Sequence, residues 1–266
     1  NESMFGALRL VSVEQGYDPR DFALVGFGGA GPLHANALGI LTDAWPVIIP
    51  PGPGVLCAYG DATTQVQDEA ARTYLTMASD LSDAKLTSDL HELQVRAGNA
   101  LLKDNIPASE HEITYQADLR YAGQAFQITI DFTEDELKQK GVTLLTDQFD
   151  AEHEQLFTFK LNDGHEILMI RAVAKAKAKS IAERQIGQTG MSLDECIIIE
   201  SRFYYEGDWY AANLYDRNKL NVGLKIAGPA IVGEMDSTTV VLPGYVAVVD
   251  AVGNLLINPD SAKGGE

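Results

Sequence analysis

Cysteine is scarce in this sequence, with only Cys57 and Cys196 among 266 residues. Two thiols far apart in the chain make neither a disulfide framework nor a zinc cluster, so they favour a reducing compartment. Long apolar runs are absent too, because none approaches the roughly 18 residues that a membrane-spanning helix requires. The sequence therefore predicts a cytoplasmic protein without a membrane-spanning segment.

Positively charged residues are also few. The chain has 20 Lys and Arg residues against 38 Asp and Glu residues, which gives a formal net charge of −18. Nucleic acids and anionic membrane surfaces attract basic patches, so we expect neither as a partner. An anionic ligand would have to be bound locally, by backbone N–H groups and a few basic side chains.

The chain opens on "NESMFGALRLVSVEQG", with neither an initiator methionine nor a signal peptide. Met4, Ala7, Leu8 and Val11 fall at helical spacing, and Gly16 suits the end of a helix. We therefore expect the sequence to be a piece of a larger protein, either cut from it or encoded as a split subunit.

Hydrophobic residues make up 45% of the sequence, enough for a substantial core, and three consecutive units are expected. Residues 1–108 read as an α/β fragment. Phe22–Phe27 is typical of a strand buried on both faces, Pro32 suits the first turn of a helix, and Trp45–Ile49 reads as the next strand. Apolar spacing then predicts an amphipathic helix over Leu86, Leu90, Leu93, Ala97 and Leu101.

The second and third units are expected over residues 109–199 and 200–266. The second is an α+β module, in which Thr133 and Glu136 form the capping box of a short helix that Gly141 ends. The third is rich in glycine, proline and β-branched residues, which predicts a small β-rich module.

The stretch "FALVGFGGAGPLHANALGI" places three glycines between a strand and a helix. It matches neither G-x-G-x-x-G nor the P-loop, which requires a Lys followed by Ser or Thr. Uncovered N–H groups at a helix N-terminus bind anions, and Gly28, Gly29 and Gly31 would let a ligand approach the backbone. The alternative is that these glycines only allow close packing of strand on helix. The pattern leaves both interpretations open.

His34 would lie in the first turn of that helix. The helix N-terminus disfavours an imidazolium, so the ring is expected to be neutral. A neutral ring could bond a ribose, a phosphate or a metal-bound water. It could equally be a capping or core histidine.

Asp118 and Arg120 share one face of a predicted strand and are the other catalytic candidates. They could hold a substrate carboxylate or form a structural ion pair. The remaining histidines lack metal-ligand spacing, so no metal site is predicted within the chain.

Four blocks resemble the hydantoinase A/5-oxoprolinase family, in the order expected for it and over nearly the whole chain: "DPRDFALVGFGGAGPLHA", "ADLRYAGQAFQITI", "FDAEHEQLFTFKLNDGHEILMIRAVA" and "GPAIVGEMDSTTVVLPGYVAVVDAVGNLLI". The last block includes "EMDSTTVV", which could also be only a tight β-turn.

The resemblance implies the C-terminal lobe of an actin- or sugar-kinase-like ATPase fold, followed by the two modules. A Gly-Gly loop in that lobe contacts the adenosine and α-phosphate of ATP, a role that would fall to Gly28, Gly29, Ala30 and Gly31. The resemblance further implies Mg²⁺, a small cyclic amide as substrate, and a second, hydantoinase B-type subunit.

Two departures from the family pattern matter. The Asp-Gly-Gly-Thr phosphate loop of the N-terminal lobe is missing, so this chain alone should be inactive and needs an upstream segment or partner. Cys57 stands where the family has serine, and its small-residue context favours a buried structural thiol over a nucleophile.

The leading hypothesis is the C-terminal part of an ATP-dependent hydrolase of cyclic amides such as hydantoin or 5-oxoproline. One alternative is the corresponding part of an acetone- or acetophenone-type carboxylase subunit, which the same family includes. The other is a non-catalytic assembly module whose glycine turn is merely structural.

Overall fold

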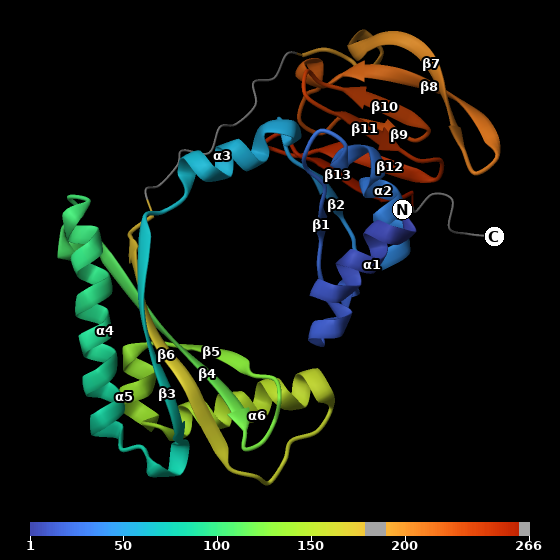
Figure 1. Ribbon diagram of the computed structural model, residues 1–266. Helices are drawn as coiled ribbons and strands as arrows, with labels where there is room; N and C mark the ends of the chain where they lie inside the picture. The colour runs from blue at the N-terminus through green and yellow to red at the C-terminus, as the bar shows by residue number, and fades with distance from the viewer. Residues whose placement is uncertain (179–189, 261–266) are drawn as a thin grey trace. The chain divides into compact units, whose positions relative to one another are not determined.

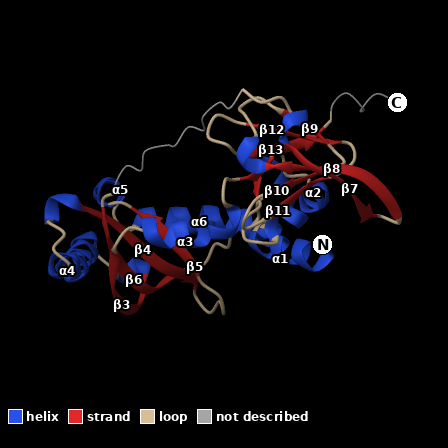
Figure 2. Cartoon of the chain, turned by 90° about the horizontal axis from the view of Figure 1, so that it is seen from above, coloured by secondary structure: helices blue, strands red, loops and turns tan. Residues whose placement is uncertain are grey.

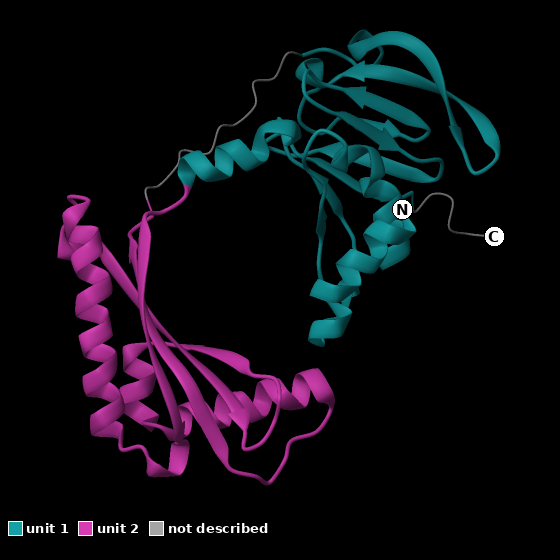
Figure 3. Cartoon of the chain, in the orientation of Figure 1, with its two compact units in different colours: residues 1–63, 181–266 teal, residues 64–180 magenta. Residues whose placement is uncertain are grey.

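A computed structural model describes residues 1–178 and 190–260. The chain divides into two compact units (Figure 3): Asn1–Thr63 joins Ile181–Glu266 in the first, and Thr64–Ser180 forms the second. The second unit is therefore an insertion in the sequence of the first.

The first unit contains two sheets and three α-helices within its described residues, as Figures 1 and 2 show. Its elements are α1 (Glu2–Val11), β1 (Leu24–Val25), α2 (Gly31–Thr42), β2 (Val47–Ile49), α3 (Leu56–Thr63), β7 (Ile197–Tyr205), β8 (Asp208–Asp216), β9 (Lys225–Ala227), β10 (Ala230–Gly233), β11 (Thr238–Val241), β12 (Tyr245–Val249) and β13 (Leu255–Pro259). The predicted strand–helix–strand order before residue 50 is confirmed, but the strands are shorter than expected. The first strand is not buried on both faces as predicted, since Val25 is 47% exposed.

The sheets have the strand orders β1-β2-β13-β12-β9 and β11-β10-β8-β7. β1 pairs with β2 in parallel, and β2 pairs with β13 antiparallel through the register Leu255↔Ile49. Val47, Ile49, Leu255 and Ile257 are completely buried in one core cluster. The shared core makes one unit of two segments that are distant in sequence.

The second unit is a four-stranded antiparallel sheet with three helices. Its elements are β3 (Gln67–Met77), α4 (Asp83–Lys103), β4 (His111–Tyr121), β5 (Ile128–Phe132), α5 (Glu134–Lys140), α6 (Thr143–Phe157) and β6 (His165–Ala176), and the strand order is β3-β6-β4-β5. The capping box of Thr133 and Glu136 is present, and Gly141 ends α5 with a φ of 62°.

The two units differ from the three that the sequence suggested. The amphipathic helix expected in residues 1–108 is α4, and its five predicted apolar residues are buried in one cluster with Tyr115 and Ile170 of the second sheet. The β-rich segment expected to stand alone over 200–266 shares its core with β2. Both differences have the same cause: an element belongs to the unit against whose residues it is buried, and those residues can be distant in the sequence. Residues 179–189 and 261–266 of the expected units lie outside the described residues.

No helix in the described part of the chain combines the length and hydropathy needed to cross a bilayer.

A buried carboxylate joins α4 to the sheet. Asp89 is 5% exposed and accepts hydrogen bonds from Arg72 Nη1 at 2.9 Å, Lys85 Nζ at 2.7 Å and the Tyr74 hydroxyl. Burial acts to raise the pKa of Asp89, but the bonds from Lys85 and Tyr74 outweigh it and lower that pKa. The ionised form is therefore the one that stabilises the second unit.

We expect Asp89→Asn to lower the free energy of unfolding of the second unit by about 1–3 kcal/mol at neutral pH, because its donors lose a charged acceptor. A lowered pKa contributes stability above the ordinary Asp value, and this contribution disappears as the pH falls through the folded-state value. The difference in unfolding free energy between native protein and variant should thus shrink as the pH falls below about 4, the ordinary Asp value, in urea titrations. Asp147→Asn, at an exposed position on α6, is the control. A difference that stays constant with pH would contradict this account.

Candidate functional site

The N-terminus of α2 follows directly from the glycine-rich loop after β1. Ala30 precedes the helix, no side chain caps it among the described residues, and Pro32 occupies its first turn. Within the loop, Gly28 N donates to Pro53 O at 2.7 Å, and Leu33 N donates to Ala30 O at 3.2 Å. The start of α2 is therefore a helix end without a side-chain acceptor, which carries partial positive charge.

The glycines of this region have distinct tasks. A Cβ on Gly26 would lie 2.6 Å from Ala35 Cβ, and a Cβ on Gly39 would lie 2.5 Å from Val47 Cγ2. These two residues allow the close approach of α2 to the strands. Gly28 has a φ of +84°, which L side chains rarely adopt.

Neither close packing nor a positive φ requires glycine at positions 29 and 31. A Cβ on Gly29 would meet nothing closer than Asp236 O at 3.6 Å, and one on Gly31 nothing closer than 3.9 Å. Close packing, the alternative explanation for the glycines, therefore accounts for Gly26 and Gly39 but not for Gly29 and Gly31.

A second loop and a C-terminal turn adjoin the first loop. Gly52 N donates to Glu234 Oε2 at 3.1 Å, and Ser237 Oγ donates to Gly29 O at 3.2 Å. A Cβ on Gly54 would lie 2.6 Å from Asp236 O. The turn Glu234–Ser237, closed by the bond from Glu234 N to Ser237 O, thus holds both glycine loops.

The predicted turn in "EMDSTTVV" is present, but its contact with the loops was not anticipated. In the sequence, only the acidic and hydroxyl side chains of this turn indicated that it could bond to other backbone segments. The partners of that turn lie about 200 residues earlier, and no local pattern identifies them.

Buried charge lies under these loops. Arg217 donates to Ile49 O at 3.0 Å and to Gly253 O at 2.7 Å, while its Nη1 lies 3.9 Å from Glu234 Oε1. Burial lowers the pKa of Arg217; burial also raises the pKa of Glu234, which the Arg217 charge opposes. Asp236 Oδ2 and Thr239 Oγ1 are buried without a hydrogen-bond partner among the described residues. Arg217 therefore joins β2 to the chain after β12 and faces the carboxylate that holds Gly52.

His34 lies in α2 as predicted, and its Nδ1 is 3.0 Å from Asn1 Oδ1. Its role toward a ligand stays a prediction, as do those of Gly28, Gly29, Ala30 and Gly31.

Asp118 and Arg120 lie on β4 in the second unit and have separate partners. Asp118 is 1% exposed, accepts from Arg171 Nη2 at 2.6 Å and accepts from Thr129 Oγ1 at 2.7 Å. Arg120 donates to Glu166 at 2.7 Å. These cross-strand pairs support a structural role for both residues. The ion pair expected between Asp118 and Arg120 is not formed, because each pairs with a residue of another strand.

Cys57 corrects an expectation, because it is exposed on α3 rather than buried. The small residues around it suggested packing, but no residue of α3 is buried.

Comparison with known proteins decides the family. The model described as "Hydantoinase/oxoprolinase C-terminal domain" matches residues 76–256, and the one described as "Hydantoinase/oxoprolinase" matches residues 1–70. The chain belongs to the hydantoinase/oxoprolinase family. The predicted family is confirmed.

Members of this family with curated sequences match almost all of the chain. An uncharacterized protein of Methanocaldococcus jannaschii is 34% identical over 97% of this chain and 36% of its own length. The caprolactamase subunit alpha of Pseudomonas jessenii is 27% identical over 97% of this chain and 38% of its own. The chain thus spans less than two fifths of the length of these relatives.

Similarity to two solved structures confirms the mixed α/β fold class. The ATP-dependent caprolactamase of Pseudomonas jessenii superimposes with a TM-score of 0.85 at 25% identity, over 97% of this chain and 38% of that one. A nucleotide-free acetone carboxylase gives 0.64 at 21% identity with the same coverage, which shows likeness of fold alone.

The glycine assignments predict opposite effects for two similar substitutions. Gly26→Ala should lower the free energy of unfolding of the first unit by about 1–3 kcal/mol, because its Cβ overlaps Ala35 and Ile49. Gly31→Ala should leave that free energy unchanged or raise it by up to about 1 kcal/mol, because alanine favours a helix. Denaturant titration followed by circular dichroism measures both. An equal loss in the two variants would refute the distinction between packing glycines and open glycines.

Proposed function

We propose that this chain is the C-terminal part of an ATP-dependent cyclic-amide hydrolase and supplies the adenosine side of its nucleotide site. The observation that carries the proposal is the open backbone at Gly29 and Gly31, where the fold itself does not require glycine. The N-terminus of α2, which no described side chain caps, provides N–H groups at the same place. The caprolactamase relative is described as ATP-dependent, and caprolactam is a cyclic amide.

The residues of the loop fit a nucleotide. A ligand can approach Gly29 and Gly31 without meeting a Cβ, and the positive end of α2 favours a phosphate. His34, in the first turn of α2, can bond a ribose hydroxyl or a phosphate oxygen. Ser237 and Glu234 hold the two loops in place through Gly29 and Gly52. The net charge of −18 makes such local backbone recognition necessary.

The chemistry explains why such a hydrolase uses a nucleotide. An amide C–N bond is stable because nitrogen donates into the carbonyl, and ATP with Mg²⁺ supplies phosphoryl transfer to that oxygen, which removes the resonance. This chain's part is to position the nucleotide. Catalytic side chains, the Mg²⁺ ligands and the substrate pocket then come from the rest of the assembly, and the chain alone is inactive.

The proposed assembly has two further components. One is an N-terminal lobe carrying the phosphate loop. The other is a second, hydantoinase B-type subunit, which is supported by the caprolactamase relative being named a subunit alpha. The assembly would work in the cytoplasm.

A ketone carboxylase subunit is the second candidate, favoured by the fold shared with acetone carboxylase. The higher TM-score and identity of the caprolactamase favour the hydrolase. The assembled protein should hydrolyse ATP when a lactam, hydantoin or 5-oxoproline is added. Hydrolysis that depends instead on a ketone and bicarbonate would identify the carboxylase.

Calorimetric titration of the assembled protein tests the nucleotide site. Gly31→Ala should weaken ATP binding by about tenfold or more, because a methyl group would enter the space of the ligand. Gly60→Ala on α3, where a Cβ meets nothing within 4 Å, is the matched control and should bind like the native protein. Unchanged affinity in Gly31→Ala would remove this loop from the site. An assembly that binds no nucleotide would leave only the non-catalytic module.

A further inference from the structure

The hairpin of β7 and β8 extends beyond the other strands of its sheet (Figures 1 and 2). β10 pairs only with Asn213–Asp216 of β8, so the half of the hairpin nearer its turn has no third strand among the described residues. Glu206 and Gly207 form the turn, and their φ angles of 48° and 92° suit a two-residue hairpin loop. Two-stranded ribbons are marginally stable in water, so this half would gain stability from a further strand.

The half of the hairpin nearer the turn carries exposed aromatic side chains. Tyr204 and Trp209 are 60% and 61% exposed, and their rings lie 5.6 Å apart. The guanidinium of Arg202 lies over the Trp209 ring, 4.5 Å from its centroid. On the opposite face of the ribbon, the rings of Phe203 and Tyr210 stack at 6.0 Å. Tyrosine, tryptophan and arginine are enriched at protein–protein interfaces, so this composition indicates an interaction surface.

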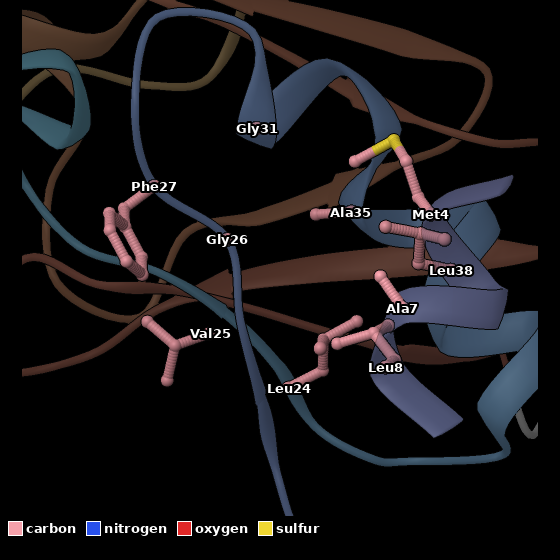
Figure 4. A pocket seen from close by; sticks show the side chains of 10 residues that line it. All are labelled: Met4, Ala7, Leu8, Leu24, Val25, Gly26, Phe27, Gly31, Ala35 and Leu38. Carbon is pink, nitrogen blue, oxygen red and sulfur yellow. The ribbon is translucent and has the colours of Figure 1, made fainter. Parts of the chain in front are cut away.

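An apolar pocket of the first unit lies elsewhere. It measures about 350 Å³ and is located between α1, β1 and α2 (Figure 4). Gly31, which the proposed nucleotide site uses, is part of its lining, and no residue of β7 or β8 is. The exposed aromatic residues of the hairpin therefore require a separate explanation.

The outer edge of β7 is available for pairing. β7 is the terminal strand of its sheet, and no strand in the described part of the chain pairs with its outer side. Tyr205 and Asp208 flank the two-residue turn opposite each other, so they form a hydrogen-bonded pair. Because such pairs alternate along an antiparallel ladder, the N–H and C=O groups of Glu200, Arg202 and Tyr204 point to the outer edge.

The charges of β7 identify which strand fits this edge. Charged residues usually protect an exposed edge, but Glu200 and Arg202 are opposite in sign and lie symmetrically about Ser201. If two copies of β7 pair antiparallel around Ser201, Glu200 of each copy faces Arg202 of the other. Ile199 of each copy then faces Phe203 of the other. The nearest alternative registers would place Glu200 opposite Glu200 or Arg202 opposite Arg202, and like charges directly opposite are destabilising.

We propose that β7 pairs with β7 of a second copy of this chain, antiparallel and centred on Ser201. The two hairpins then form a continuous sheet in the order β8-β7-β7-β8, which supplies the further strands that each ribbon lacks. Such an interface is isologous, so the ion pair between Glu200 and Arg202 forms twice around the two-fold axis. The proposal concerns assembly and does not depend on the nucleotide site, and both experiments that test it are carried out without ATP.

Disulfide trapping locates the two-fold axis. At the centre of the pair, the Cα atoms of the two Ser201 residues should lie about 4.5 Å apart, within the range that a disulfide spans. We expect oxidation of the full-length protein in its native assembly, carrying Ser201→Cys and Cys57→Ser, to give a disulfide-linked product of two copies. Ala211→Cys, at an exposed position of β8 away from the axis, is the matched control and should give little product. No product at position 201, or equal yields at both positions, would overturn the proposal.

Charge reversal tests the register and the identity of the partner. In the Ser201→Cys protein, Glu200→Arg brings like charges together twice and should slow disulfide formation by about tenfold or more. Adding Arg202→Glu should restore the rate, because opposite charges then face each other again. Glu154→Arg, at an exposed position of α6, is the control for a changed charge and should have no effect. A double variant that stays as slow as Glu200→Arg, or a product that contains a different subunit, would refute the pairing of two copies.

Discussion

The antiparallel pairing of β2 with β13 is the constraint on which the first unit depends. It joins the sheet that begins at β1 to strands formed about 200 residues later, and Val47, Ile49, Leu255 and Ile257 bury its core completely. The same arrangement brings Leu242 N to Asn36 Oδ1 at 2.8 Å, within α2. The turn Glu234–Ser237 can hold the two glycine loops only because this pairing places it there. The candidate nucleotide site is thus a product of long-range strand pairing rather than of the glycine motif alone.

The glycine motif combines two different requirements in one short stretch. Gly26 permits α2 to pack closely on the strands, whereas Gly29 and Gly31 leave open space above the helix end. A sequence motif cannot separate these tasks, because both demand the absence of a Cβ. The geometry around each position separates them: packing requires glycine at position 26 and does not require it at positions 29 and 31.

Local features of the fold could be predicted from the sequence, and long-range ones could not. The capping box at Thr133, the helix over Leu86–Leu101 and the strand–loop–helix at Gly28 follow from spacing and composition, which act over a few residues. The domain to which that helix belongs depends on its burial against Tyr115 and Ile170. Likewise, the partners of Asp118 and Arg120 depend on the register of β6, and Cys57 is exposed because α3 packs into neither core. The glycine pattern alone left both anion binding and close packing open. Only the resemblance to the family indicated ATP as the ligand.

The insertion of one unit into the sequence of the other has a consequence for synthesis on the ribosome. Residues 64–180 are contiguous, so they can fold as soon as they leave the exit tunnel. The first 63 residues emerge earlier but cannot complete their sheet until β13 has been translated. Until then Val47 and Ile49 of β2 lack the strand against which they are buried, so the nascent chain exposes an apolar face of the kind that chaperones bind.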